Sequence, residues 1–499
     1  MALVTINGIA LNVKAGALLS DAIFTQHALD MPCAGYGRCG KCRVIAHGAI
    51  SPLTDVEKTH LTAEEIAQGV RLACCTHIMG NCTILLSATN TSQICIDGAM
   101  PDFVHAPFYS TYGVAVDIGT TTLATRLYGP NGILLAQGSS LNPQAYWGAD
   151  VISRVQAALN GKADLLSKTV CAGIGALLKQ MAAKADIAVN SIDGIVITGN
   201  TAMLYLLTQT NPKCLASAPF LATHLFGETI EAASLHLPCH NALVYLPPCI
   251  SAFIGADTTT ALLASGICEK ENSHMLVDIG TNGEIALWHH GRLSCCSTAA
   301  GPAFEGSGIS MGMAGKNGAV DHVYTNGTAL CAHVIEEASP KGICGSGVVD
   351  ALACLLQLDQ MDTTGILKQD PMPIASPVCL TQRDVRMAQL AKSAIRAGMQ
   401  TLLTAERIET GDISELAVAG GFGSYLNVKN AGRIGLLPEE LTSRTRVLGN
   451  AALCGAAMLL LNRHFIHRVE LLAACAHTVD LSSNSVFMEA YIENILFSG

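Results

Sequence analysis

The stretch VDIGTTT at residues 116–122 occurs a second time, as VDIGTNG at residues 277–283. Each copy ends one apolar run and is followed by another, LATRLY at 123–128 and EIALWH at 284–289, after which comes a turn signal that contains glycine. This pattern predicts a strand, a tight turn rich in polar side chains, a second strand and a hairpin. Two such units in one chain predict a duplicated fold that closes on one nucleotide.

The residue types in the two turns suit the phosphates of a nucleotide. Glycine lets the backbone approach a ligand closely, and threonine hydroxyls and exposed N–H groups can bond phosphate oxygens. Asp117 and Asp278, at the ends of the first strands, can hold a hydrated Mg²⁺ that bridges those phosphates. One such turn alone would fit an ordinary β-turn equally well, so the prediction depends on the repetition.

The composition is that of a large and apolar chain. Its 499 residues suffice for roughly two to four domains. Only 14% of them are charged and the mean hydropathy is +0.39, as expected for strands buried on both faces of a parallel sheet. The alternative is membrane insertion, but no apolar run of about 18 residues and no signal peptide is evident, so we expect a cytoplasmic protein. The net charge of −10 argues against nucleic acid as a partner.

Without a secretory signal, the twenty cysteines are not expected to form a disulfide framework. Most of them are scattered among Ala, Leu and Val and are expected to be small buried hydrophobic residues. One group differs, because it follows a C-x5-C-x2-C spacing inside a glycine-rich loop and is completed by a cysteine further along the chain. Its members are Cys33, Cys39, Cys42 and Cys74.

Four thiolates in a glycine-rich loop are suited to a [2Fe–2S] cluster, whose sulfides accept hydrogen bonds from nearby N–H groups. The spacing resembles that of plant-type ferredoxins with one extra residue in the first gap. A hairpin predicted at 2–13 around Asn7-Gly8, followed by a helix at 18–29, matches the β-grasp ferredoxin fold. A zinc site is the alternative, but zinc knuckles usually carry two C-x2-C pairs. Cys74 is the preferred fourth ligand, and Cys75 and Cys82 remain candidates.

The remaining sequence divides at the two turns. Residues 1–88 form the predicted ferredoxin-like domain, and 89–111, rich in Ser, Thr and Asn, are typical of a linker that lets the cluster move or is a passive tether. Residues 112–272 and 273–499 then form one lobe each, and the end of the chain returns to the first lobe. Within the second lobe, a helix is predicted at 383–403.

Further polar and glycine-rich turns follow apolar strands in both lobes. Asp257 interrupts an apolar run before a helix, so it is either an N-cap or a ligand to metal or attacking water. Gly345 and Ser346 precede a helix, where N–H groups suit an anion or the ribose-phosphate region. Gly420-Gly421 leaves room for a flat adenine base. Each turn alone would be an ordinary strand–helix connection, and only their order favours a nucleotide site.

That order resembles the ASKHA superfamily of acetate and sugar kinases, Hsp70 and actin. Within it, the chain resembles the reductive activators of corrinoid enzymes, which join an N-terminal [2Fe–2S] ferredoxin domain to an ASKHA ATPase. The match covers nearly the whole chain and is carried by VDIGTTT, NPQAYWGADVISR, GNTAM, VDIGTNGEIAL, AGPAFEGSGI, GICGSGVVD, AVAGGFGSYL and GNAALCGAA. The resemblance implies an α/β fold: a two-lobed ASKHA ATPase preceded by a β-grasp domain. Larger members carry an extra domain between linker and ATPase, whereas here the first turn follows the linker almost at once.

The resemblance also implies the activity. The cluster would reduce Co(II) to Co(I) in the corrinoid protein of a methyltransferase system, an uphill step driven by ATP hydrolysis, with an external electron-donor protein. Asp117, Asp278, Asp257 and Glu284 are the expected catalytic residues. Those expected at the nucleotide are Gly119, Thr120, Thr121, Thr122, Gly199, Asn200, Gly280, Thr281, Asn282, Gly283, Gly345, Ser346, Gly420, Gly421, Phe422 and Gly423.

Three other functions stay open at this point. The chain could be a small-molecule kinase with an accessory ferredoxin, an activator of a different low-potential metalloenzyme, or a redox-sensing partner with a silent nucleotide site. The paired aspartates and turns argue against the last, and the N-terminal cysteine pattern argues against activators that hold a [4Fe–4S] cluster between subunits. The corrinoid partner, the electron donor and the oligomeric state, with a homodimer as one alternative, are not decided by the sequence.

Overall fold

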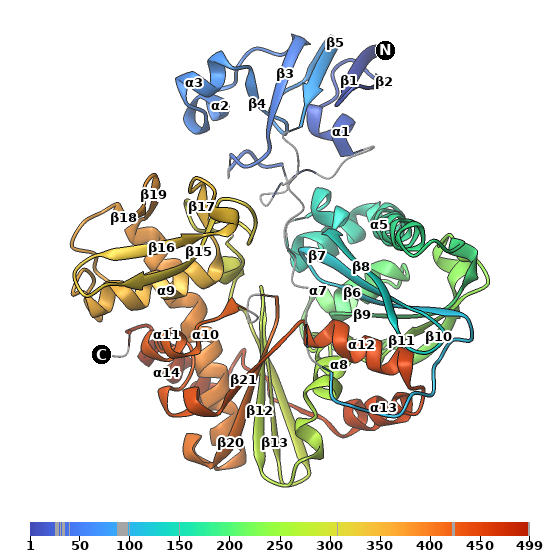
Figure 1. Ribbon diagram of the computed structural model, residues 1–499, viewed down its shortest axis with the longest axis vertical. Coiled ribbons are helices and arrows are strands. Elements are labelled where there is room, and N and C mark those ends of the chain that lie inside the picture. The colour runs from blue at the N-terminus through green and yellow to red at the C-terminus, as the bar shows by residue number, and fades with distance from the viewer. Residues whose placement is uncertain are drawn as a thin grey trace.

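The computed structural model describes residues 1–24, 29, 31, 35–38, 40–86, 98, 100–148, 150–306, 308–421 and 425–497. Figure 1 shows an N-terminal domain above two larger lobes. None of the helices in the described part of the chain has the length and apolar character needed to span a membrane.

The N-terminal domain is a five-stranded mixed sheet in the order β2-β1-β5-β3-β4. The predicted hairpin is confirmed: β1 (Ala2–Ile6) pairs antiparallel with β2 (Ile9–Val13), and both Asn7 and Gly8 have positive φ. Positive φ at both central residues is what the type I′ turn of a two-residue hairpin requires. The other elements are α1 (Leu19–Phe24), β3 (Arg43–Ile50), α2 (Asp55–His60), α3 (Ala63–Ala67), β4 (Val70–Leu72) and β5 (Ile78–Leu85).

The first lobe is built on a six-stranded sheet in the order β10-β11-β9-β6-β7-β8. The long helix α5 (Ala163–Lys184) covers one face and buries Leu166, Val170, Ile174 and Leu178 against the strands. The strands are β6 (Tyr112–Ile118), β7 (Thr122–Tyr128), β8 (Leu134–Leu141), β9 (Ile192–Gly199), β10 (Glu228–Glu231) and β11 (Leu243–Leu246). The other helices are α4 (Val151–Ala157), α6 (Thr201–Leu207), α7 (Lys213–Ala216) and α8 (Ala256–Ser265).

The second lobe repeats this arrangement in the order β21-β20-β12-β13-β14-β22. As β6 does with β7 and β9, the strand β12 pairs antiparallel with β13 and parallel with β20. The repeated sequence therefore corresponds to a repeated fold. The strands are β12 (Ser273–Ile279), β13 (Gly283–His289), β14 (Arg292–Thr298), β20 (Ile413–Ala419), β21 (Thr445–Gly449) and β22 (His477–Thr478).

Helices and two small sheets complete the second lobe. The predicted helix at 383–403 is confirmed as α10 (Gln382–Glu406), which a capping box at Thr381 and Asp384 begins. The other helices of the second lobe are α9 (Gly345–Gln357), α11 (Val428–Arg433) and α14 (Ser485–Glu493), and the chain after β21 continues into α12 (Ala451–Leu461) and α13 (Phe465–Cys475). The small sheets are formed by β15 (Ala319–Thr325), β16 (Leu330–Val334) and β17 (Gly342–Ile343), and by β18 (Met372–Ala375) and β19 (Val378–Leu380).

The two lobes share a core around α12 and α8. Figure 1 shows α12 and α13 beneath the first lobe, although they follow β21 of the second. A Cβ on Gly455 of α12 would collide with the backbone oxygen of Thr260 on α8, so only glycine permits this close approach. The described end of the expected linker is also fixed here, since Ala106 and Phe108 donate N–H bonds to Leu461 and Leu460.

Candidate functional site

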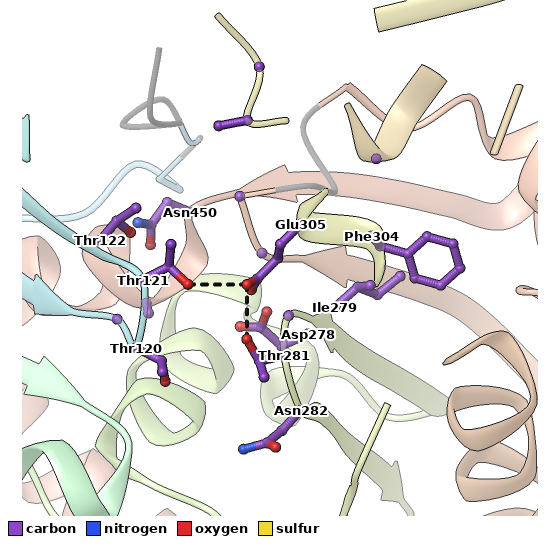
Figure 2. A pocket seen from close by; sticks show the side chains of 18 of the residues that line it. Thr120, Thr121, Thr122, Asp278, Ile279, Thr281, Asn282, Phe304, Glu305 and Asn450 are labelled. Carbon is purple, nitrogen blue, oxygen red and sulfur yellow. Dashed lines mark hydrogen bonds between the residues drawn. The ribbon is translucent and has the colours of Figure 1, made fainter. Parts of the chain in front are cut away.

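A cavity of about 280 Å³ lies between the lobes, and its wall includes residues of both turns that the sequence assigns to phosphates, 119–122 and 280–283, here called the first and second phosphate turns (Figure 2). Most of the residues that the sequence suggested line this one space. They are Asp117, Gly119, Thr120, Thr121, Thr122, Asn200, Asp257, Asp278, Gly280, Thr281, Asn282, Glu284, Gly345, Ser346, Gly420 and Gly421.

Four suggested residues are not part of the described wall. Gly199 lies behind it, where a Cβ would meet the backbone oxygen of Ile118 at 2.7 Å. Gly283 is the first residue of β13 and faces the side chain of Thr298. Phe422 and Gly423 lie outside the described residues, so the adenosine contact expected of them has no structural description.

Five carboxylates face the cavity: Asp117, Asp257, Asp278, Glu284 and Glu305. Burial raises the pKa of Asp117 to about 6, against the opposing hydrogen bond from Asn450. Burial, and then the charges of Asp257, Asp117 and Glu305, raises the pKa of Asp278 to about 7. No lysine, arginine or histidine belongs to the described wall. A set of buried oxygen ligands without a basic side chain among them suits a hard divalent cation such as Mg²⁺.

Asp257 is not the N-cap that one alternative proposed. The N-cap of α8 is Gly255, and Asp257 lies in the first turn of the helix, where it accepts the N–H of Thr258 at 2.8 Å. A Cβ on Gly255 would meet Asn200 and Thr201 closely, so only glycine lets the helix begin this near β9. Burial raises the pKa of Asp257 to about 7, and the charge of Asp117 adds to the shift. The capping interpretation is therefore wrong, and the carboxylate faces the cavity.

Glycine at 420 brings the end of β20 against the second phosphate turn. A Cβ there would lie 2.7 Å from a carboxylate oxygen of Asp278, and Gly420 has φ of +100°. Both features exclude larger residues. The sequence assigned this glycine to the adenine base, whereas in the structure its nearest neighbours are Ile279 and Asp278.

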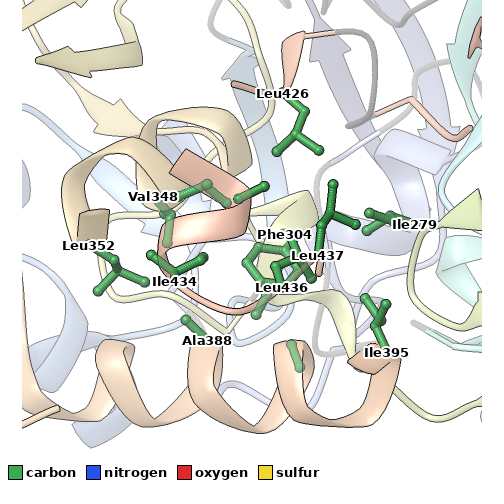
Figure 3. Close-up of a cluster of buried hydrophobic side chains, with 14 of the residues drawn as sticks. Ile279, Phe304, Val348, Leu352, Ala388, Ile395, Leu426, Ile434, Leu436 and Leu437 are labelled. Carbon is green, nitrogen blue, oxygen red and sulfur yellow. The ribbon is translucent and has the colours of Figure 1, made fainter. Parts of the chain in front are cut away.

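Glu305 connects the two phosphate turns and was not among the suggested site residues. Its Oε2 accepts hydrogen bonds from the hydroxyls of Thr121 at 3.2 Å and Thr281 at 2.9 Å, one from each lobe (Figure 2). The preceding Phe304 is buried in the core of the second lobe, near Leu436 and Leu437 (Figure 3). This anchor places the Glu305 carboxylate between the lobes.

Asn450 is a second residue that sequence reasoning did not assign to the site. It caps α12 by accepting the N–H of Leu453 at 2.8 Å, and its amide donates to Asp117 at 2.9 Å. A helix that starts in the second lobe therefore fixes a carboxylate of the first. An Asn that follows the last glycine of a strand predicts a helix N-cap. No local pattern predicts that the amide of this Asn also bonds Asp117.

The N-terminal domain, which lies above the two lobes in Figure 1, contacts both of them. Lys41 Nζ donates to the backbone oxygens of Gly312 at 2.7 Å and Gly306 at 3.4 Å, in the second-lobe segment that carries Glu305. On the first lobe, Tyr146 donates its hydroxyl to Asp21 at 2.7 Å, and its ring lies 4.5 Å from that of Phe24.

Two of the four expected cluster ligands are described, and they fit a shared metal. Cys42 Sγ and Cys74 Sγ are 3.3 Å apart. Two sulfurs bound to one tetrahedral metal at ~2.3 Å would be ~3.7 Å apart, so little movement is needed. Cys33 and Cys39 lie outside the described residues. Cys75 Sγ is 3.5 Å from Cys74 Sγ and remains an alternative, whereas Cys82 is in β5 and pairs with Gly48.

Comparison with known families divides the chain into three parts. Residues 4–79 match the 2Fe-2S iron-sulfur cluster binding domain, 112–270 match the RACo middle region, and 272–499 match the C-terminal domain of RACo, the ASKHA domain. The first match supports a [2Fe–2S] cluster, and the last supports ATP binding.

Comparison with individual proteins also finds similarity to proteins that activate or reduce corrinoid proteins. The chain is 34% identical over 418 residues to the corrinoid activation enzyme RamQ of Eubacterium limosum, covering 77% of this chain and 70% of that protein. It is 26% identical over 397 residues to a [Co(II) methylated amine-specific corrinoid protein] reductase of Methanosarcina barkeri, covering 70% of each. Among solved structures, a reductive activator for corrinoid, iron-sulfur protein aligns with a TM-score of 0.74 and 25% identity, covering 100% of this chain and 98% of that one.

Proposed function

Because this chain belongs to the RACo family of reductive activators of corrinoid proteins, we propose that it uses ATP hydrolysis to reduce the cobalt of a corrinoid protein from Co(II) to Co(I). The observation that carries the proposal is that the ferredoxin-like domain contacts both lobes, and that its contacts on the second lobe, Gly306 and Gly312, are next in sequence to the cavity-lining Glu305 and Met313. A domain in this position can respond to the nucleotide that the lobes enclose.

The redox half requires one electron for each cobalt. A [2Fe–2S] cluster accepts and passes on single electrons, at about −400 mV in plant-type ferredoxins. We propose Cys33, Cys39, Cys42 and Cys74 as its ligands, which the 3.3 Å separation of Cys42 and Cys74 supports. An electron-donor protein would reduce the cluster again after each transfer. Since the cobalt couple is expected to lie lower, transfer needs a coupled source of free energy.

The ATPase half would supply that free energy. We assign Asp117 and Asp278 to Mg²⁺, directly or through water, and Asp257 and Glu284 to the attacking water or the metal. The two turns, 119–122 and 280–283, would hold the phosphates, while Gly345, Ser346 and the turn at 420–423 would hold the nucleoside. These roles are supported by one shared cavity and by a donor set that needs a cation.

Glu305 is the residue that we expect to transmit the nucleotide state. The Glu305 carboxylate accepts hydrogen bonds from both Thr121 and Thr281 and so occupies a position where phosphate oxygens would bind the same hydroxyls. ATP would therefore displace Glu305 by competition for the two donors. Displacement would shift Gly306 and Gly312, the carbonyls that hold Lys41, and so loosen the ferredoxin domain beside Cys42.

The partners follow from this activity. The acceptor would be a corrinoid protein of a methyltransferase system, and the donor a separate low-potential protein. Both belong in the cytoplasm, where we place this chain. The oligomeric state, including a homodimer, would be determined by light scattering.

The test is anaerobic reduction of a corrinoid protein. The full chain with its cluster, a reduced donor and a Co(II) corrinoid protein are mixed, and Co(I) absorbance is followed with and without MgATP. Co(I) that forms only with MgATP supports the proposal. ATP hydrolysis and an intact cluster spectrum without Co(I), across corrinoid proteins of several methyltransferase systems, would contradict it. Phosphate transfer to a small molecule would indicate a kinase instead.

A further inference from the structure

Three consecutive carbonyls of the first phosphate turn accept hydrogen bonds from one segment of the chain, residues 142–154. Asn142 donates its side-chain amide to Gly119 O at 2.8 Å and its backbone N–H to Thr121 O at 2.8 Å. Between them, Arg154 Nη2 donates to Thr120 O at 2.7 Å. In a planar trans peptide the C=O and the next N–H point in opposite directions. The N–H groups of Thr120 and Thr121 therefore point away from Asn142 and Arg154.

Arg154 is fully buried and forms no ion pair with any carboxylate of the described residues. Its Nε donates to Gly148 O at 2.8 Å, and Nη1 contacts the sulfur of Met203 at 3.4 Å. Burial lowers its pKa to about 10, with the charge of the exposed Asp150 opposing the shift, so the guanidinium is protonated at neutral pH. Burying a charge without a counterion is costly. An anion bound nearby would offset this cost.

The local sequence is arranged to bring Arg154 to the turn. Asp150 caps α4, with a capping box that includes Ser153. Gly148 allows the approach, since a Cβ there would lie 2.7 Å from the backbone nitrogen of Arg154. Asn142 is likewise fully buried and caps the short helix at 143–146 by accepting the N–H of Gln144.

The second phosphate turn has no such arginine among its described contacts. Its Thr281 carbonyl accepts the N–H of Gly301, and Gly280 donates to Asn282 within the turn. All five carboxylates and no basic side chain line the described cavity. Positive charge near the phosphates must then come from metal, from peptide N–H groups, or from a cation behind the wall.

We propose that Arg154, together with Asn142, is a positioning residue for ATP: it turns the N–H groups of Thr120 and Thr121 toward the phosphates and supplies positive charge behind them. This inference rests on the proposed ATP site and deepens it. Arg154 acts through the Thr120 peptide without touching the nucleotide, so the inference predicts a contribution to phosphate binding and none to adenosine binding.

Equilibrium binding to the full chain distinguishes this role from a structural one. Adenosine, ADP and ATP are titrated calorimetrically into wild type, Arg154→Met and Arg154→Lys. Arg154→Met loses a charged hydrogen-bond donor, so its affinity for ATP and for ADP should fall about 10- to 100-fold. Its affinity for adenosine should stay within about twofold of the wild-type affinity. Arg154→Lys, which keeps the charge, should recover part of the loss.

Arg126→Met is the matched control. Arg126 is also buried in the first lobe, on β7, but its side chain contacts Cys454 of α12. We expect this variant to keep the wild-type ratio of ATP to adenosine affinity. The inference would be overturned if Arg154→Met lost affinity equally for ATP and adenosine, or kept the wild-type affinity for ATP. It would also be overturned if Arg154→Lys bound ATP as weakly as Arg154→Met. If wild type bound no ATP, the proposed function would fail as well.

Discussion

Replacing Glu57 with glutamine should destabilise the ferredoxin-like domain more than any neighbouring surface change. Glu57 is fully buried and accepts two hydrogen bonds from Arg71, at 2.8 and 3.0 Å. It also accepts the N–H of Leu72 at 3.1 Å and the hydroxyl of Thr76 at 2.9 Å. These two residues flank the turn at 73–75, so Glu57 fixes the turn that carries Cys74, the proposed fourth cluster ligand.

The magnitude follows from the pKa. Burial alone would raise the pKa of Glu57, but hydrogen bonds from Arg71, Thr54, Leu72 and Thr76 outweigh it and lower the pKa from 4.5 to about 2. At 1.36 kcal/mol per unit, the charged form contributes about 3 kcal/mol to the free energy of unfolding. Removing one partner of a buried ion pair typically costs about 3–5 kcal/mol, which agrees.

Urea unfolding of the holoprotein, followed by loss of cluster absorbance, measures this effect. With an m-value of about 1–1.5 kcal/mol/M, the midpoint should fall by about 2–3 M. Glu65→Gln is the matched control, because Glu65 forms the same capping box with Thr62 but is partly exposed and pairs with the exposed Arg43. Glu65→Gln should lower the free energy of unfolding by less than about 1 kcal/mol.

The pH dependence gives a second check. Because the folded pKa is depressed, the Glu57 contribution is fully present above pH 4.5 and is lost as pH falls toward about 2. The difference between wild type and Glu57→Gln should be constant from pH 8 to about 5 and narrow by about 1 kcal/mol at pH 4. Equal urea midpoints for Glu57→Gln and Glu65→Gln would refute the reasoning. So would a difference in unfolding free energy between wild type and Glu57→Gln that does not change between pH 5 and pH 4.

Three further predictions concern the nucleotide and its coupling to the cluster. Asp117→Ala should abolish ATP-driven Co(I) formation while the visible spectrum of the cluster stays intact; a lost spectrum would show that the two halves do not work separately. Removing Mg²⁺ with EDTA should stop ATP hydrolysis reversibly without bleaching the cluster, and continued hydrolysis would disprove the metal role of the carboxylates. Lys41→Met should increase hydrogen exchange in the segment at 302–312, whereas Lys58→Met, an exposed lysine of the same domain, should not. Equal exchange in both variants would exclude Lys41 as the contact between domains.

The sequence predicted the features that depend on local patterns. The repeated turn identified both central strand pairs, and Asn7-Gly8 identified the first hairpin because its φ values suit few other residues. Of the two interpretations of Asp257, the N-cap is wrong, since Gly255 rather than the polar residue caps α8. Position 255 requires glycine because a Cβ there would collide with the backbone of Asn200. The sequence around the helix does not predict this contact.

The contacts that join the parts of the site were not predictable in the same way. Thr121 and Glu305 are 184 residues apart in sequence, and Asp117 and Asn450 are 333 apart. Neither pair follows a helical or strand period, so the sequence offers candidate residues but not their partners. Arg154 shows the same limit, because within its own helix it looks like any exposed polar position, whereas the structure buries it against Thr120.

The distribution of these contacts indicates how the lobes can move. At α8 and α12 the lobes meet through close apolar packing, where Gly455 allows backbone contact with Thr260. At the cavity, the contacts between the lobes named above are hydrogen bonds, from Thr121 to Glu305 and from Asn450 to Asp117. Apolar packing resists displacement because separation exposes surface to water, whereas hydrogen bonds can be exchanged for bonds to water or phosphate at small net cost. Motion driven by ATP should therefore pivot about α8 and α12 and be largest at the cavity mouth, where Lys41 contacts the second lobe.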